Sequence, residues 1–388
     1  MICSKEKCTG CEACLSICSQ NAILMEKDEY GNIYPNINEI KCIHCNLCKE
    51  VCPQLKDKLK FKLPITAYAM YNKNYKERNK STSGGLASIF YRKILEENGV
   101  IYGVSNLFGN SENLKFIRID DMKDLYKVKG SKYTHCHINK IFISVRTDLL
   151  ANKKVLFIGT PCQISGLKSY LMKEYENLIT IDIICHGVAS QQLLFEQIKE
   201  LKIPIDKVKW ISFRKLSSNN CNFCFNLFDF NDNSIYEREA EYVPYYKNFL
   251  EGNFYRENCY YCKYAQIQRI SDITIGDFWG IDHNSSIYDD ENKGISLVMP
   301  ITDKGIKLVN LIFDMCNFEE RTIEEARKNN GQLNYPMKKN KKYKIYINHY
   351  PKYGFKRTMN NMLTLKEKIK LNIKRSYIYM VYKKFKRR

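Results

Sequence analysis

The sequence predicts two folded units joined by a short linker and followed by a basic extension. Three observations carry this prediction: a cysteine repeat at the start, alternating apolar runs and helical stretches in the middle, and a lysine-rich end. The repeat predicts a small α+β module over residues 1–56, and residues 57–66 read as the linker. The alternation predicts an α/β domain with a mixed or parallel sheet over residues 67–330. Residues 331–388 are expected to form a basic, helical C-terminal tail.

The first unit is built on an internal repeat of the pattern Cys-x2-Cys-x2-Cys-x3-Cys. The two copies start 34 residues apart, and they consist of Cys8, Cys11, Cys14 and Cys18, then Cys42, Cys45, Cys48 and Cys52. Between the copies, the apolar runs Ala22–Met25 and Ile33–Pro35 flank the turn-forming stretch Asp28–Asn32. This arrangement predicts a β-hairpin.

The cysteine spacing is typical of a bacterial-type ferredoxin with two [4Fe–4S] clusters, in which the fourth cysteine of each run serves the other cluster. The expected ligand sets are therefore Cys8, Cys11, Cys14 and Cys52 for one cluster, and Cys42, Cys45, Cys48 and Cys18 for the other. A pair of zinc knuckles is the alternative. Ser19 stands where the first run would usually have a proline, which loosens the match slightly. Cys3 lies outside both runs and is expected to be a bystander thiol.

The chain has 17 cysteines, a number that would also suit a secreted disulfide scaffold. However, the sequence shows no charged segment followed by an apolar run before the first cysteines, so no secretory signal is expected. Cysteines in tight groups without such a signal are typical of metal ligands in a reducing cytoplasm. No run of 18 apolar residues is present, so no membrane span is expected.

The α/β domain is predicted from its sequence of helices and strands. A helix is expected over Leu86–Asn98, directly after Ser83-Gly84-Gly85, and another over Gln191–Leu201. Strands are expected at Val155–Ile158, Leu178–Ile184, Val208–Phe213, Phe223–Phe230 and Ile273–Ile275.

Two features of this domain indicate ligands. A Gly-Gly pair at a helix N-terminus suits an anion such as a pyrophosphate, although an ordinary serine-capped turn is the alternative. Cys162 and Cys185 each follow the carboxyl end of an apolar strand, the edge at which open α/β sheets bind ligands. Together with Cys259-x2-Cys262 they could form a four-thiolate set. The alternative is two small buried thiols and a zinc half-site.

Several well-separated segments between about residues 65 and 300 resemble the beta-subunit family of coenzyme F420 hydrogenases and dehydrogenases. They are Ser83–Gly85, Gly130–Tyr133, Val155–Leu167, Asp182–Ser190 and Cys259–Gly280. Ala189 departs from the family pattern, which has proline there. The resemblance implies a flavin-binding α/β domain with FAD, and a third [4Fe–4S] cluster on Cys162, Cys185, Cys259 and Cys262. The residues expected to hold FAD are Ser83, Gly84, Gly85, Gly130, Ser131, Lys132, Asp277 and Trp279.

Individual side chains leave alternatives open. Trp279 is either part of the flavin wall or a buried tryptophan at a strand end. His186 either relays a proton to the flavin as a catalytic group or donates a hydrogen bond to a cluster sulfur. Cys221 and Cys224 are expected to be packing residues. Cys136, between two histidines, is expected in a polar loop rather than in a metal site.

The formal net charge of +20 is concentrated at the end of the chain, where Lys338–Arg388 hold 18 lysines and arginines and one acid, Glu367. Apolar residues recur there at helical spacing: Met362, Leu365, Ile369, Ile373, Tyr377 and Met380. A basic amphipathic helix suits a membrane surface or an acidic redox partner. The alternative is a solvated basic end.

The function expected from these features is that of a cytoplasmic iron–sulfur flavoprotein oxidoreductase, with peripheral contact at the inner membrane surface through the tail. Electrons would pass from the ferredoxin clusters through the third cluster to FAD, and on to or from a substrate, a deazaflavin or another compound. The alternative is a non-catalytic electron-transfer subunit that feeds a partner enzyme. A redox-sensing regulator with a tail that binds nucleic acid is a weaker alternative, so nucleic acid is not expected as a partner.

Overall fold

The computed structural model describes residues 2–56, 59–108, 114–214, 223–282, 284–288 and 293–369. Within these ranges the largest sheet has eight strands in the order β13-β3-β12-β11-β7-β6-β4-β5. In that order the strands are Cys316–Arg321, Ala67–Asn72, Ser296–Pro300, Ile273–Asp277, Leu178–Ile183, Val155–Gly159, Val100–Val104 and Phe116–Ile119. Strands β4, β6, β7 and β11 are parallel neighbours, whereas β5, β12, β3 and β13 pair antiparallel. The predicted mixed sheet is confirmed.

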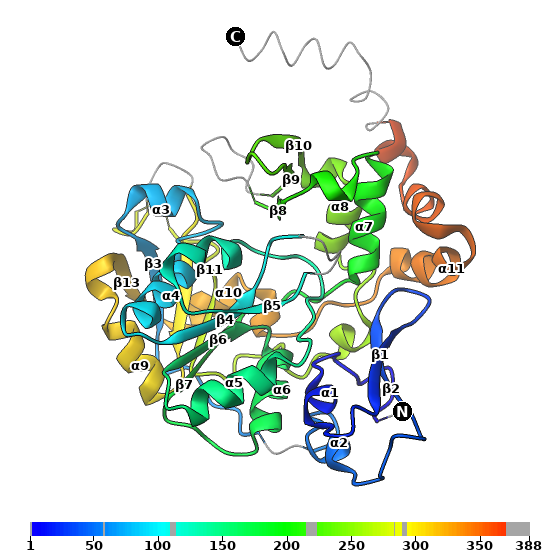
Figure 1. The fold of residues 1–388 in the computed structure, drawn as a ribbon. Helices are drawn as coiled ribbons and strands as arrows, with labels where there is room; N and C mark the ends of the chain where they lie inside the picture. Colours follow the sequence, from blue (N-terminus) through cyan, green and yellow to red (C-terminus); the bar gives the residue numbers. More distant parts are fainter. Residues whose placement is uncertain are drawn as a thin grey trace.

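Helices cover both faces of this sheet (Figure 1). On one face α4 (Leu86–Glu96) and α9 (Asp303–Asn310) share a core with Leu156 and Ile158 of β6. On the other face α5 (Ile141–Leu150) and α6 (Pro161–Leu171) share a core with Val155 and Phe157. Successive residues of a strand point to opposite faces, so a wholly apolar run such as β6 suits a strand buried on both sides.

The predicted elements of this domain are present with shifts of a few residues at their ends. The strand runs correspond to β6, β7, β8 (Trp210–Ser212), β9 (Cys224–Phe228) and β11, and the helical stretches to α4 and α7 (Gln191–Glu200). Two short helices, α3 (Tyr75–Asn79) and α10 (Ile323–Lys328), lie near the antiparallel end of the sheet.

A second group of elements follows β7 in the chain. It consists of the antiparallel strands β8 (Trp210–Ser212), β9 (Cys224–Phe228) and β10 (Ser234–Glu239), with helices α7 (Gln191–Glu200) and α8 (Pro244–Leu250). Helix α11 (Lys341–Asn361), which bends at Gly354, packs on this group and buries Tyr343, Tyr346 and Tyr350 in its core. Residues 341–361, expected to belong to a basic tail, are therefore part of the folded core.

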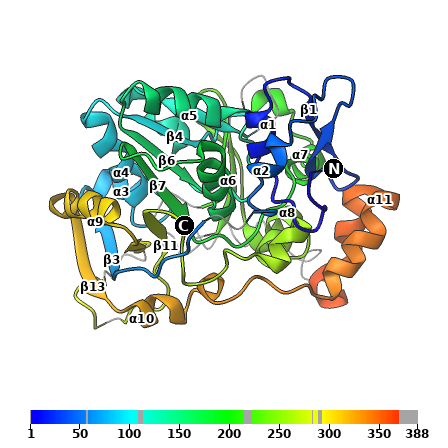
Figure 2. The same cartoon turned by 90° about the horizontal axis from the view of Figure 1, so that it is seen from below.

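The N-terminal module contains α1 (Ala13–Ile17), β1 (Ile23–Lys27), β2 (Ile33–Ile37) and α2 (Leu47–Glu50). Strands β1 and β2 form the predicted antiparallel hairpin. Figures 1 and 2 both show the module beside α6, with its hairpin next to α11. The described part of the expected linker contacts the body at Lys62, whose backbone exchanges two hydrogen bonds of 2.8 Å with that of Arg269.

The predicted amphipathic stripe near the C-terminus is only partly within the described residues. Met362 is buried, whereas Leu365 and Ile369 are exposed. Ile373, Tyr377 and Met380 lie outside the described residues, as does Cys221. In the described part of the chain, no helix combines the length and apolar character needed to cross a bilayer.

Candidate metal centres and cofactor cavity

The first thiol set joins the two ends of the N-terminal module. The pKa of Cys11 is raised to about 12 and that of Cys14 lies well above its usual value, in both cases chiefly through burial and in part through the neighbouring thiols Cys8 and Cys52. Cys52 comes from the second cysteine run and lies with three cysteines of the first, as the exchanged pattern of a two-cluster ferredoxin requires. Left-handed backbone at Glu12, φ 58°, lets the chain turn between Cys11 and Cys14.

Cys3 does not behave as the isolated bystander expected from the sequence. It is buried, and its thiol hydrogen-bonds to Cys8 and Cys52. That contact is the main reason why the pKa of Cys8 falls to about 6 and that of Cys52 to about 7. The spacing of the repeat gave no sign of this position, because Cys3 belongs to neither run.

The second thiol set lies at the surface of the module. Cys42 and Cys45 lie close enough to Cys48 to raise the pKa of its thiol, an effect smaller than that of burial. Cys45 is exposed. Cys18 and Cys48 both pack against the small core of the module.

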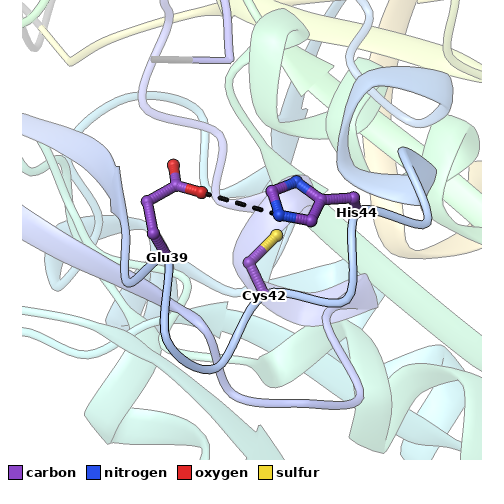
Figure 3. A group of neighbouring side chains, drawn as sticks. All are labelled: Glu39, Cys42 and His44. Carbon is purple, nitrogen blue, oxygen red and sulfur yellow. Dashed lines mark ion pairs between the residues drawn. The ribbon is translucent and has the colours of Figure 1, made fainter.

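Glu39 and His44 lie beside Cys42 on this surface loop (Figure 3). One ligand atom from each of the three residues lies within 4.8 Å of the others, and the carboxylate is 4.0 Å from the His44 Nε2 atom. The group is largely exposed, and its thiol is the first of the second cysteine run. It is therefore not a metal site independent of the second thiol set.

A third thiol set forms where the parallel strands β6 and β7 end. The pKa values of Cys162 and Cys185 are raised to about 12 each, chiefly by burial and in part by neighbouring thiols of the set. Cys185, Cys262 and Cys162 raise the pKa of Cys259 in the same way, after the effect of burial. The structure thus brings together Cys162 at the start of α6, Cys185 after β7, and the pair on the turn η4 (Glu257–Tyr261) and just after it.

The spacing of these thiols favours a cluster over a single ion. A tetrahedral zinc site with Zn–S bonds of about 2.3 Å places its sulfurs roughly 3.8 Å apart. Within the described ranges, no three of the predicted cysteine ligands lie within 4.8 Å of one another. A body of four irons and four sulfides is wider than one ion, so all-thiol sets that are not gathered as tightly as a zinc site suit it better.

A cavity of about 810 Å³ lies at the carboxyl ends of the parallel strands. Its wall combines the sequence-predicted loops from distant parts of the chain: Ser83, Gly85, Gly130, Ser131, Lys132, Cys185, His186, Asp277 and Trp279. Asn329–Lys338, which sequence reasoning did not single out, close another side. The cavity therefore lies at the edge where open α/β sheets bind ligands.

The two predicted glycine loops meet at this cavity, and the Thr82 and Ser131 hydroxyls lie 3.2 Å apart. Gly85, at φ 86°, caps α4 and lines the cavity. Gly84 does not line it. A Cβ atom there would lie 2.4 Å from the Met70 carbonyl oxygen and 2.9 Å from the Ser296 nitrogen. Gly84 therefore allows the loop to pack on strands β3 and β12.

Among the charged side chains that line the cavity, cations outnumber acids. The Lys132 ammonium group donates to the carbonyls of Val128, Lys129 and Gly130, each at 2.9 Å. Burial lowers the pKa of Lys132 to about 7. Arg214 is buried and forms an ion pair with Asp277.

Aromatic rings lie next to this ion pair. The Arg214 guanidinium lies 4.3 Å from the centre of the Phe223 ring and 5.8 Å from that of Trp279. Trp279 is 37% exposed, so its ring faces the cavity and is not a fully buried core residue. Arg214 was missed at the sequence level because its position depends on Asp277, which lies 63 residues away.

Two histidines differ in their surroundings. His186 lines the cavity, and burial lowers its pKa. His135 is buried with Cys136 instead of lying in the polar loop expected for this segment. Burial, then Arg256 and His137, hold the pKa of His135 well below its usual value. The sequence prediction failed because the segment 134–137 lies between the N-terminal module and the cavity.

Comparison with known proteins agrees with the two parts of this structure. Residues 152–326 match the family described as the C terminus of the coenzyme F420 hydrogenase/dehydrogenase beta subunit, and residues 7–55 match a 4Fe-4S dicluster domain. The first stretch contains the third thiol set, and the second contains both cysteine runs. Residues 152–326 thus correspond to the C-terminal domain of the coenzyme F420 hydrogenase/dehydrogenase beta-subunit family, and residues 7–55 form a 4Fe–4S dicluster domain.

Individual relatives match parts of this chain. The coenzyme F420-dependent sulfite reductase of Methanocaldococcus jannaschii is 26% identical over 163 residues, which are 42% of this chain and 24% of that protein. An uncharacterized ferredoxin of the same organism is 36% identical over 53 residues, which are 14% of this chain and 68% of the ferredoxin. Among solved structures, the F420-reducing [NiFe] hydrogenase complex from Methanosarcina barkeri aligns with a TM-score of 0.46 at 16% identity, over 70% of this chain and 89% of that one.

Proposed function

We propose that the chain is an FAD-dependent iron–sulfur oxidoreductase, with FAD in the cavity and a third [4Fe–4S] cluster on Cys162, Cys185, Cys259 and Cys262. When bound, FAD supplies two-electron chemistry to a substrate, while the clusters supply single electrons.

The observation that carries the proposal is the position of Cys185. Its thiol belongs to the third set and also lines the cavity. Cys162 belongs to the same set and lies on the side of that set that faces the N-terminal module. Gly166, one turn after it on α6, faces Cys11. Residues four apart lie on one helix face, about one 5.4 Å turn apart along the axis. One helix therefore links the first thiol set to the third.

Charge and shape of the cavity support an anionic, partly aromatic ligand. Lys129, Lys132, Arg214 and Lys338 line it, while Asp277, the single acid among its described lining residues, is paired with Arg214. The first turn of α4 also lines it, and free backbone N–H groups there favour a pyrophosphate. Trp279 and Phe223 offer ring faces against which a flat heterocycle can stack.

His186 is the candidate proton carrier of the cavity. Its lowered pKa keeps the imidazole neutral near pH 7, and a neutral ring can accept a proton at one nitrogen and donate from the other. The neighbouring Cys185 also allows the other role considered for His186, hydrogen bonding to a cluster sulfur.

The experiment that tests the FAD site is flavin extraction from anaerobically purified protein. We expect about one FAD per chain in the wild type and at least a tenfold lower content in Ser131→Trp, because the indole would fill the cavity between the two glycine loops. Ser131→Ala removes the hydroxyl without adding volume and should keep the flavin. Iron content should be equal in all three proteins. No flavin in the wild type, or a full complement in Ser131→Trp, would contradict the site.

The substrate is proposed from the relatives by name only. Two of them use or reduce coenzyme F420, so a deazaflavin is one candidate, and the cavity geometry does not restrict the choice to it. Reduction of a deazaflavin and of general dyes by the purified chain, compared side by side, separates these candidates.

A second candidate function is an electron-transfer subunit that feeds a partner enzyme. It is favoured by the exposed loop around the second thiol set, where Ile40 is 97% and Ile43 62% exposed beside the exposed Cys45. A redox partner protein docking there would deliver or receive single electrons. Turnover of a reduced dye by the purified chain without any partner would exclude a purely non-catalytic role.

A further inference from the structure

Arg256 lies at the junction between the N-terminal module and the third thiol set. It is 0% exposed, the most bulky of the fully buried side chains in the described ranges. Its backbone N–H donates to the Val188 carbonyl at 2.8 Å, and its own carbonyl accepts from the N–H of Cys259 at 2.9 Å. Arg256 therefore begins the turn that carries one thiol of the third set.

The side chain of Arg256 reaches in the opposite direction, to the first thiol set. Its Nε–H donates to the Cys8 carbonyl at 2.8 Å, and its guanidinium lies 4.1 Å from the centre of the Tyr34 ring. A Cβ atom on Gly10 would lie 3.3 Å from the guanidinium carbon and 2.6 Å from the His135 ring. Gly10, at φ 65°, thus allows the Cys8–Cys11 loop to close over Arg256.

The terminal nitrogens of the Arg256 guanidinium lack an oxygen acceptor in the described part of the chain. Both nitrogens are buried, and no carboxylate among the described residues forms an ion pair with Arg256. Arg269 provides a contrast, since it is equally deep but pairs with Asp182 at 2.9 Å and donates to backbone carbonyls. A buried, unpaired guanidinium is strongly unfavourable. Arg256 therefore needs an anion that the polypeptide alone does not supply.

Sulfur ligands are the anions within reach. The Arg256 Nε–H donates to the carbonyl of Cys8 in the first set at 2.8 Å. The Arg256 carbonyl accepts from the N–H of Cys259 in the third set at 2.9 Å. The same residue thus contacts a ligand residue of the first set and one of the third. A cubane with four thiolate ligands carries a net charge of about −2, which becomes more negative on reduction.

We propose that Arg256 compensates the negative charge of the first ferredoxin cluster and of the third cluster, donates N–H groups toward their sulfurs, and so raises their reduction potentials. Hydrogen bonds and positive charge next to a cluster stabilise its reduced state. Arg256 is a positioning and tuning residue, since the electron itself passes between clusters. In each reduction one electron enters one cluster, and no bond is made or broken. For the third cluster the inference rests on the proposed function; for the first it does not.

The test is an anaerobic redox titration of the full-length protein, reduced with dithionite and followed by electron paramagnetic resonance. Arg256→Gln should move the midpoint of the first cluster to a more negative potential. We expect the ratio of reduced to oxidised cluster at a fixed potential to fall about tenfold, which is about 59 mV for a one-electron couple. Arg256→Lys keeps the charge and should keep most of the potential. Arg118→Gln is the matched control, because its described partners are Asp120 and Asp148 and no cysteine.

Four results bear on the inference. Unchanged potentials in Arg256→Gln with full iron content overturn it, and so does a loss of iron that is equal in the Gln and Lys variants. Loss of iron in Arg256→Gln alone supports it, because the charge is then required for the cluster to be held. A wild-type chain that binds only about eight irons refutes the third cluster of the proposed function. The potential of the first cluster still tests Arg256 in that case.

Discussion

At the scale of single residues, the contacts between the N-terminal module and the body depend on two glycines. Gly10 leaves room for Arg256 and His135, and Gly166 leaves room for Cys11. At Gly166 a Cβ atom would lie 2.8 Å from the Cys11 Cβ and 3.0 Å from its sulfur. Because Gly166 is buried within α6, this contact fixes how closely the first thiol set approaches the helix that starts next to Cys162.

Gly166→Ala is therefore expected to destabilise the protein by about 1–3 kcal/mol through overpacking. The sign of the change in stability is informative, because a glycine-to-alanine change in a helix interior without overpacking would add roughly 1 kcal/mol of stability. Thermal unfolding followed anaerobically by circular dichroism measures the net effect. Gly331→Ala is the control, since its nearest neighbour would lie 4.0 Å away. A higher melting temperature in Gly166→Ala would show that Cys11 does not pack against α6 in this way.

Residue-scale roles were also the least predictable from sequence. The eight cysteines of the repeat could be assigned because the chemistry of a cluster imposes a short, regular spacing. Arg256 could not be found in this way, because its partner Cys8 lies 248 residues away. The surroundings of Cys3 and Gly84 could not be predicted for the same reason, since they involve Cys52 and strands β3 and β12.

At the scale of elements, the hairpin β1–β2 is an anchor of the module. Tyr30 at its turn packs its ring 5.4 Å from Tyr346 of α11, and its hydroxyl donates to the Ile347 carbonyl at 3.0 Å. The Tyr30 carbonyl accepts a hydrogen bond of 2.7 Å from the hydroxyl of Ser190, which directly precedes α7. Helix α11 therefore holds the module against the second group of elements, although its lysines and tyrosines resembled a solvated tail.

Tyr30→Ala should loosen this anchor and lower the free energy of unfolding by about 2 kcal/mol, because it removes a half-buried aromatic contact. Tyr30→Phe keeps the ring and loses only the hydrogen bond, so we expect a loss of about 1 kcal/mol. Denaturant unfolding of the full-length chain gives both values. Equal stability of the wild type and Tyr30→Ala would mean that the hairpin does not anchor the module.

Strands were predicted well where burial on one face or on both faces of the sheet imposes a simple pattern of apolar residues. The run Val155–Ile158 is apolar throughout because it lies between helices, and it was recognised as a strand. The edge strand β13 was not predicted, since residues such as Phe318 and Glu319 alternate without a clear apolar face and depend on pairing with β3. The seating of residues 59–62 on the body was missed because it depends on backbone contact with Arg269.

At the scale of the whole molecule, three thiol sets and one cavity lie in order. The second set is at the surface, the first faces α6, the third lies at the strand ends, and Cys185 reaches the cavity wall. Catalytic sites that need single electrons at a buried position require such a relay, and ligands on the ends of sheet strands hold it rigidly. We therefore expect the third thiol set to hold a cluster.

Iron and labile sulfide analysis of the anaerobically reconstituted full-length chain tests that claim most directly. We expect about twelve irons and twelve sulfides in the wild type, from three [4Fe–4S] clusters. In Cys162→Ser we expect about eight of each, with the ferredoxin signals intact. Eight irons in the wild type, twelve in Cys162→Ser, or stoichiometric zinc in place of the missing iron would contradict it.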